Sequence, residues 1–133
     1  MPAPPFFYRE TLGIRITVRP RYVGEQSMPA AGRFVFAYAV RIENVGVEAA
    51  QLITRQWRIH DAIGEELEVA GDGVVGQQPM LAPGEVHEYG SFCILKAPSG
   101  YMEGSYHFVR ADGTEFDALV PRFHFAVNST TEP

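Results

Sequence analysis

An all-β sandwich with no substantial helix is the fold class that the sequence predicts, and three observations support it. Several segments alternate apolar and polar residues with a period of two, as half-buried strands do. Turns rich in glycine and proline separate these segments at intervals of about 8–12 residues. Apolar residues never recur at helical spacing over three turns. The chain has 133 residues, 46% hydrophobic and 20% charged, which matches one globular domain.

The alternating segments predict strands one after another along the chain. Expected strands cover residues 12–18, 34–42, 51–61, 65–70, 86–95, 101–109 and 115–126. Pro20 is expected to close the first strand, and Pro121 to mark a bulge or an edge strand. The Asp112-Gly113 pair predicts a hairpin turn. Short strands at this spacing are typical of an immunoglobulin- or fibronectin type III-like β-sandwich of about seven to eight antiparallel strands.

We expect a single domain over residues 1–133. Its core is predicted at roughly 10–126, with a flexible N-terminus (1–7) and tail (127–133). No apolar run approaches the roughly 20 residues that cross a bilayer, and residues 1–5 lack the pattern of a signal peptide, so no membrane association is expected. The single cysteine, Cys93, excludes an internal disulfide and favours a reducing, cytoplasmic compartment.

The charge distribution bears on possible partners. The net charge of −5 argues against nucleic-acid binding through bulk charge. Residues 1–60 nevertheless hold eight arginines and four acids, whereas 61–133 hold three basic and twelve acidic residues. A basic surface patch around Arg15, Arg19 and Arg21 is one interpretation. Arginine is more abundant than lysine, and two explanations are open. Arginine suits bidentate contacts with phosphate, or, more simply, the genome has a high GC content.

A G-x-G-x-x-G motif occupies Gly71–Gly76. Glycines at this spacing let backbone N–H groups approach a pyrophosphate at the start of a helix. Pro79 and Pro83 exclude that helix, no βαβ unit surrounds the motif, and no acid lies at 91–96, where a ribose-binding carboxylate is expected. A Gly-Lys-Ser/Thr sequence is also missing. A turn-rich structural loop is therefore favoured, with a loop that binds an anion or a partner as the alternative.

Catalytic and metal-binding residues form no convincing group. Cys93 lies in mid-strand with no base beside it, and Ser91 has no identifiable triad partner. The histidines fall on different strands without metal-ligand spacing. They are His60, His87, His107 and His124. We predict that the protein is not an enzyme and has no cofactor. A weak divalent-cation site stays as an alternative. The acids at 65–68 favour a solvated edge strand.

Arg55 and Trp57 are the candidate partner-binding pair. They are two residues apart, so they share one face of a strand, and a guanidinium can stack on an indole there. An exposed Arg–Trp pair is typical of a binding hot spot. Packing in the core is the default expectation for Trp57 itself.

The order and spacing of these residues resemble the ApaG family over roughly residues 12–125. The resemblance is carried by Gln26-Ser27, Pro29, Phe34–Asn44, Gln51–Ile59, Asp61-Ala62, Gly64, Val69, Gly71–Gly76, Pro79, Leu81, Pro83–Glu85, Tyr89, Ser91, Met102, Gly104, Tyr106 and Pro121–Phe123. Many members of the family have Glu where Gln77 stands and His where Gln56 stands. These two departures argue against an acid–base or metal-binding role at either position.

The resemblance implies a fibronectin type III-like fold. Bacterial members of the family are associated with cobalt resistance and magnesium efflux. Their gene often accompanies one for a diadenosine tetraphosphate hydrolase, which keeps a pyrophosphate ligand as an alternative. Similar domains in F-box and polymerase-delta-interacting proteins resemble protein-binding modules.

The leading hypothesis is a non-catalytic protein-binding module. The alternatives are a small-ligand binder for pyrophosphate or a phosphorylated nucleotide through Gly71–Gly76, and a divalent-metal binder. The candidate site residues are Gly71, Gly73, Gly76, Gln77, Arg55 and Trp57.

Overall fold

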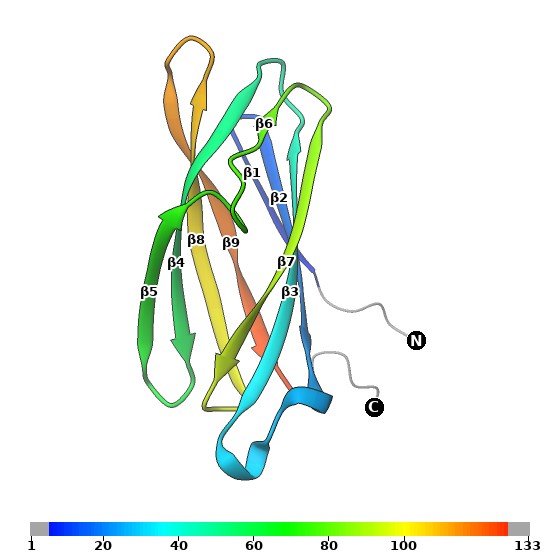
Figure 1. Ribbon diagram of the computed structural model, residues 1–133, viewed down its shortest axis with the longest axis vertical. Helices are drawn as coiled ribbons and strands as arrows, with labels where there is room; N and C mark the ends of the chain where they lie inside the picture. The colour runs from blue at the N-terminus through cyan, green and yellow to red at the C-terminus, as the bar shows by residue number, and fades with distance from the viewer. Residues whose placement is uncertain (1–5, 128–133) are drawn as a thin grey trace.

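The computed structural model describes residues 6–127 as two antiparallel sheets that pack face to face (Figure 1). The first sheet has the order β1-β2-β3-β7. Its strands are β1 (Phe7–Thr11), β2 (Ile14–Tyr22), β3 (Phe34–Asn44) and β7 (Val86–Leu95). The second sheet has the order β5-β4-β8-β9. Its strands are β5 (Glu66–Asp72), β4 (Ala50–Asp61), β8 (Ser99–Arg110) and β9 (Glu115–Ala126). The two-residue strand β6 (Met80–Leu81) pairs with the start of β4.

The predicted all-β sandwich is confirmed. In the described residues, helical structure is limited to two three-residue 3-10 turns, Gly24–Gln26 and Pro29–Ala31, in the β2–β3 loop. No helix between residues 6 and 127 has the length and apolar character needed to span a membrane. Residues 1–5 and 128–133, which hold most of the predicted flexible ends, lie outside the described part of the chain.

The strand count exceeds the prediction, because β1 and β6 were both missed. The first strand thus starts at Phe7, three residues before the predicted start of the core at residue 10. Leu12 and Gly13 form a tight turn between β1 and β2, with φ angles of 49° and 88°, instead of starting a strand. Two consecutive positive φ angles are typical of a hairpin turn whose twist matches the flanking strands.

The predictions for the two prolines inside strands had different outcomes. Pro20 does not close β2, because it pairs with Tyr38 and the strand continues to Tyr22. Among the described residues, β1 pairs with β2 only as far as Val18. Pro20 lies beyond this pairing, so its lack of an N–H costs no hydrogen bond to β1. Pro121 meets both expectations, since β9 is an edge strand and its register with β8 shifts at this point.

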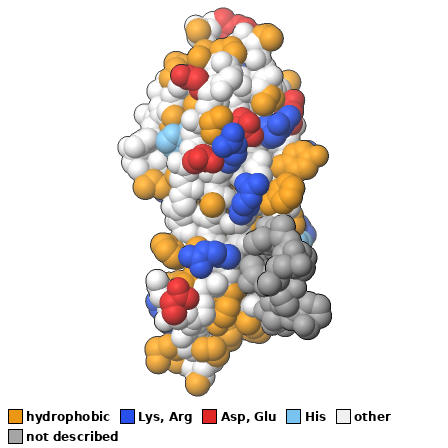
Figure 2. All heavy atoms as spheres, turned by 90° about the vertical axis from the view of Figure 1, so that its right-hand side faces the viewer, with side chains coloured by type: hydrophobic (Ala, Val, Ile, Leu, Met, Phe, Trp, Pro, Cys, Tyr) orange, Lys and Arg blue, Asp and Glu red, His pale blue; other side chains and the backbone are white. Residues whose placement is uncertain are grey.

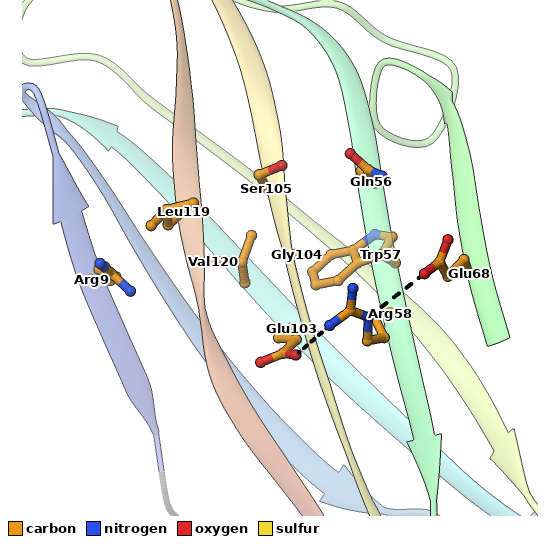
Figure 3. Close-up of a pocket in the computed structure, with 10 residues that line it drawn as sticks. All are labelled: Arg9, Gln56, Trp57, Arg58, Glu68, Glu103, Gly104, Ser105, Leu119 and Val120. Atoms are coloured by element: carbon orange, nitrogen blue, oxygen red, sulfur yellow. Dashed lines mark hydrogen bonds and ion pairs between the residues drawn. The ribbon is translucent and has the colours of Figure 1, made fainter. Parts of the chain in front are cut away.

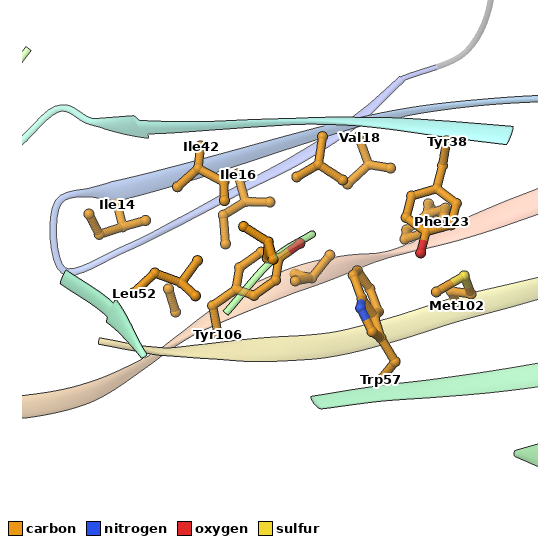
Figure 4. Close-up of a cluster of buried hydrophobic side chains, with 14 of the residues drawn as sticks. Ile14, Ile16, Val18, Tyr38, Ile42, Leu52, Trp57, Met102, Tyr106 and Phe123 are labelled. Carbon is orange, nitrogen blue, oxygen red and sulfur yellow. The ribbon is translucent and has the colours of Figure 1, made fainter. Parts of the chain in front are cut away.

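Aromatic side chains from both sheets fill the space between them (Figure 4). Trp57 is at the centre of this group. Its ring lies 5.9 Å from Tyr38, 5.8 Å from Tyr106 and 5.9 Å from Phe123, measured between ring centroids. These edge-to-face contacts add to the area that each ring buries. The default expectation that Trp57 packs in the core is confirmed.

The two sides of the sandwich differ. On one side the edge strands β1 and β9 pack together, and the Leu119 N–H donates to Thr11 Oγ1 at 3.2 Å. On the other side the edge strands are β5 and β7, and cavities open between the sheets there. We call these sides the closed edge and the open edge.

Candidate binding cleft at the open edge

A cleft of about 410 Å³ enters the sandwich at the open edge, between β4 and β5 on one side and β3 and β7 on the other. It is lined by Tyr38, Arg55, Trp57, Ile59, Val69, Val75, Tyr89, Ser91, Phe92, Cys93 and Met102. We call this cavity the open-edge cleft. The structure thus brings together Arg55, Trp57 and a residue of the glycine motif, which the sequence had suggested on separate grounds.

Arg55 holds the glycine motif in place. Its guanidinium Nη1 donates to the carbonyl oxygens of Asp72 and Gly73, both at 2.9 Å. Arg55 lies opposite Gly71 in the β4–β5 register, and a Cβ on Gly71 would come within 2.9 Å of the guanidinium. Gly71 therefore leaves space for the Arg55 guanidinium in this position. It belongs to β5, and so does Asp72, so the motif begins in a strand instead of the predicted loop.

The rest of the motif is a tight turn. Val74 and Gln77 exchange backbone hydrogen bonds of 2.8 and 3.0 Å around Val75 and Gly76, whose φ angles are 47° and 77°. Gly73 has a φ of 62°, and a Cβ there would overlap the carbonyl oxygen of Gln77. Glycine is favoured at both Gly73 and Gly76 because its backbone adopts this region without steric cost.

This turn offers few free donors to an anion. The N–H of Gly73 donates to the Ile53 carbonyl, and the N–H groups of Val74 and Gln77 donate to each other's carbonyls. A phosphate site at such a motif needs several backbone N–H groups that point outward together. The geometry therefore favours the structural interpretation of the glycines, and the pyrophosphate alternative gains no support from it.

Trp57 is buried, with 4% of its surface exposed, so an exposed hot spot at this residue is excluded. Among the contacts of the described residues, no guanidinium lies over its indole; Arg55 turns to the glycine turn instead. Figure 3 shows Trp57 beneath a hollow on the outer face of the second sheet. Arg58 lines this hollow and forms ion pairs there with Glu103 at 3.5 Å and Glu68 at 3.8 Å.

Tyrosine hydroxyls line the inner part of the open-edge cleft, and the sequence analysis missed them. The hydroxyls of Tyr89 and Tyr106 hydrogen-bond to each other at 2.5 Å. Burial raises the pKa of both groups, and of Tyr38, so all three are neutral at physiological pH. Ser91 lies opposite Tyr38 in the β3–β7 register and hydrogen-bonds to it, which partly offsets the rise in the Tyr38 pKa.

Cys93 also faces the cleft, but its thiol is inert at neutral pH. Burial, and then the negative charge of Asp61, raise the pKa of this thiol to about 12. The thiolate is the nucleophilic form, so Cys93 is a packing residue, as its mid-strand position predicted. Across residues 6–127, no three His, Cys, Asp or Glu side chains gather as a metal ion requires. The divalent-cation alternative gains no ligand set from this part of the chain.

Comparison with known proteins decides the family. The model of the ApaG domain family matches residues 24–110, which include β3 to β8 and the whole glycine motif. The chain belongs to the ApaG family. "Protein ApaG" of Anaeromyxobacter dehalogenans is 56% identical over 117 residues, which are 88% of this chain and 92% of that protein. "Protein ApaG" of Rhodospirillum centenum is 54% identical over 113 residues, 85% of this chain and 87% of that protein.

A solved structure agrees with the ApaG assignment. The crystal structure described as the putative ApaA protein from Bordetella pertussis superimposes with a TM-score of 0.83 at 48% identity. The superposition covers 94% of this chain and 97% of the other. The resemblance inferred from the residues is thus confirmed, and the sandwich is the fold of the family.

Proposed function

We propose that this ApaG domain is a non-catalytic module that binds another protein at its open edge. The observation that carries the proposal is a group of apolar side chains around the mouth of the open edge. Leu67 of β5 is 59% exposed, Val75 of the glycine turn 66% and Phe92 of β7 59%. Phe92 lines both cavities of this edge, together with Val75 in one and Leu67 in the other. Exposed apolar residues that gather from separate segments are typical of interaction sites.

The backbone of the edge strands adds to this surface. β5 and β7 each end a sheet, so one side of each strand presents N–H and C=O groups without a ladder partner in residues 6–127. An extended segment of another protein commonly binds by extending such a sheet. The raised pKa values keep the Cys93 thiol and the Tyr89 hydroxyl in their neutral forms, so neither supplies a ready nucleophile, which favours binding over chemistry at this edge.

We place this activity in the cytoplasm, where the unpaired Cys93 is compatible with a reducing environment. The ApaG resemblance links the family to cobalt resistance and magnesium efflux. We propose that the present protein contributes to such a process through its partner.

Site-directed photo-cross-linking in cells tests the proposal. A photoreactive amino acid replaces Val75 in one variant and Val47 in a control, because Val47 is also exposed but lies in the β3–β4 loop. We expect a discrete cross-linked species from position 75 and none from position 47. Identical species from both positions, or none from position 75, would contradict protein binding at the open edge.

Arg55→Met sharpens this test. The substitution removes the two hydrogen bonds that hold the glycine turn, and with it Val75, at the cleft. We expect the cross-linking yield from position 75 to fall while the domain stays folded by circular dichroism. Arg58→Met is the matched control, since Arg58 lies on the same strand but on the outer face. An equal loss in both variants would assign the effect to charge alone.

A further inference from the structure

Another hollow, of about 560 Å³, lies on the outer face of the first sheet, on the other side of β7 from the open-edge cleft. It is lined by Arg19, Pro20, Arg21, Ala37, Tyr38, Ala39, Gly90, Ser91 and Phe92. We call it the outer groove. Its form follows from strand register, since Arg19, Ala39 and Gly90 make one row across β2, β3 and β7, and Arg21, Ala37 and Phe92 make the next.

Small residues in the middle of these rows create the groove. Ala37, Ala39 and Gly90 have little or no side chain, so they form an apolar floor. The long side chains of Arg19 and Arg21 border it on β2, and the Phe92 ring borders it on β7. Successive outward side chains on a strand are about 6.6 Å apart, so the two guanidinium groups flank the same floor.

The charges of this face are unevenly compensated. Arg15 pairs with Glu10 at 3.4 Å, and Arg41 pairs with Glu88 at 3.0 Å. In contrast, neither Arg19 nor Arg21 forms an ion pair with any of residues 6–127. Arg19 only stacks over the Phe6 ring, at 5.2 Å. Figure 2 shows several basic side chains on this face, and those in the upper half have acidic side chains beside them.

We propose that the outer groove binds an extended acidic segment of a partner protein. Arg19 and Arg21, which have no carboxylate partner within residues 6–127, match acidic side chains, and guanidinium–carboxylate bonds are charge-assisted. The apolar floor and the Phe92 ring match an apolar side chain next to those acids. A nucleic acid fits this surface less well, because it presents charge without the apolar group and the protein as a whole is acidic.

This inference rests on the proposed protein-binding function and adds a second contact surface to it. Phe92 lines both the outer groove and the open-edge cleft. A partner that fills both cavities therefore contacts the edge strand β7 on its two faces. Of the basic patch suggested around Arg15, Arg19 and Arg21, the outer groove uses the two arginines that form no ion pair within residues 6–127.

An amide NMR titration of the full chain tests the inference. The probe is a synthetic peptide, acetyl-Asp-Glu-Asp-Leu-Phe-Gly-Ser-amide. One control peptide has lysine at the acidic positions, and a second has glycine at the two apolar positions. Inorganic phosphate is titrated separately. We expect saturable shifts at Ala37, Ala39 and Gly90 with the first peptide alone. Equal shifts with the lysine peptide, with phosphate, or away from the groove would overturn the inference.

Charge variants supply the matched comparison. Arg19→Gln with Arg21→Gln removes the two unpaired charges, whereas Arg58→Gln with Arg122→Gln removes two charges from the outer face of the other sheet. Loss of two charge-assisted contacts should weaken peptide binding at least about tenfold, and the control pair should change it less than about twofold. Equal weakening by both pairs, or none by the first, would overturn the inference.

A third variant and one cross-check complete the test. Ala39→Glu adds a carboxylate on an exposed part of the floor and should abolish peptide binding while the fold is kept. A concentration-dependent rise in mass that is lost in this variant would identify a second copy of the chain as the occupant and overturn the inference. If the peptide does not bind while cross-linking from position 75 persists, this inference alone is overturned. If the peptide binds but position 75 gives no cross-link, only the proposed function is overturned.

Discussion

The closed edge and the open edge of the sandwich use the same kinds of residue in opposite ways. At the closed edge, Phe125 of β9 is 1% exposed and stacks on Phe36 with 4.8 Å between ring centroids. At the open edge, Phe92 of β7 is 59% exposed, and the interior beside it holds the hydroxyls of Tyr38 and Tyr89. The closed edge is thus packed into the core, whereas the open edge leaves apolar surface exposed, which is the surface that the proposed function assigns to a partner.

Substitution of the two phenylalanines should give the largest contrast. Phe125→Ala leaves a cavity in a packed aromatic cluster and should lower the free energy of unfolding by roughly 3–5 kcal/mol. Phe92→Ala removes an exposed ring and should change it by less than about 0.5 kcal/mol. Urea denaturation followed by circular dichroism measures both values. A large loss in the Phe92 variant would show that the open edge also carries the fold.

The glycine turn gives a second contrast within the open edge itself. Gly73→Ala should cost roughly 3 kcal/mol, because the new Cβ overlaps the Gln77 carbonyl in a backbone with positive φ. Gly76→Ala has open space around its Cβ and should cost about 1 kcal/mol for its positive φ alone. Thermal unfolding of both variants is the measurement. Equal stability of the two would mean that the turn is not a fixed part of the fold.

The sequence predicted some elements well for a physical reason. β7 and β9 match their expected limits because each lies between clear turns and alternates inward and outward residues, in β9 on both sides of the irregularity at Pro121. β1 was missed because Tyr8, Arg9 and Glu10 are all exposed, so the strand has no apolar period. Its turn also uses Leu12 at positive φ, where glycine or asparagine is the usual signal.

The site was harder to predict than the fold. The contact of Arg55 with the glycine motif follows from the register of two neighbouring strands, which the sequence only suggests. Tyr89 and Ser91 enter the cleft because β7 ends the sheet opposite β5, and that arrangement depends on pairings between residues far apart in the chain. Burial of Trp57 depends likewise on residues far apart in the chain, since Tyr38 of the opposite sheet and Phe123 of β9 pack against its ring.

Titration of a histidine on the outer face of the β8–β9 pair should have the smallest effect on stability. This effect should be confined to the closed side of the molecule. His107 Nδ1 lies 2.8 Å from Asp117 and Nε2 lies 2.7 Å from Glu115. Hydrogen bonds with Asp117, then Glu115, raise the pKa of His107 above its ordinary value of about 6.5. Because the folded state binds this proton more tightly, the stabilisation is complete below about pH 6.5 and is lost as the pH rises through the raised pKa.

The sign of this dependence is testable by urea denaturation at a series of pH values, with His107→Gln as the reference. The stability difference between the two proteins should be largest in acid and shrink as the pH rises. The exposed position of the carboxylates keeps the effect small and sensitive to salt. Cross-linking from Val75 should not change over the same range, because the ion pairs join β8 to β9 and the cleft lies at the opposite edge. A parallel change in cross-linking would show that the two edges are coupled through the shared second sheet, and the division of roles between them would then be wrong.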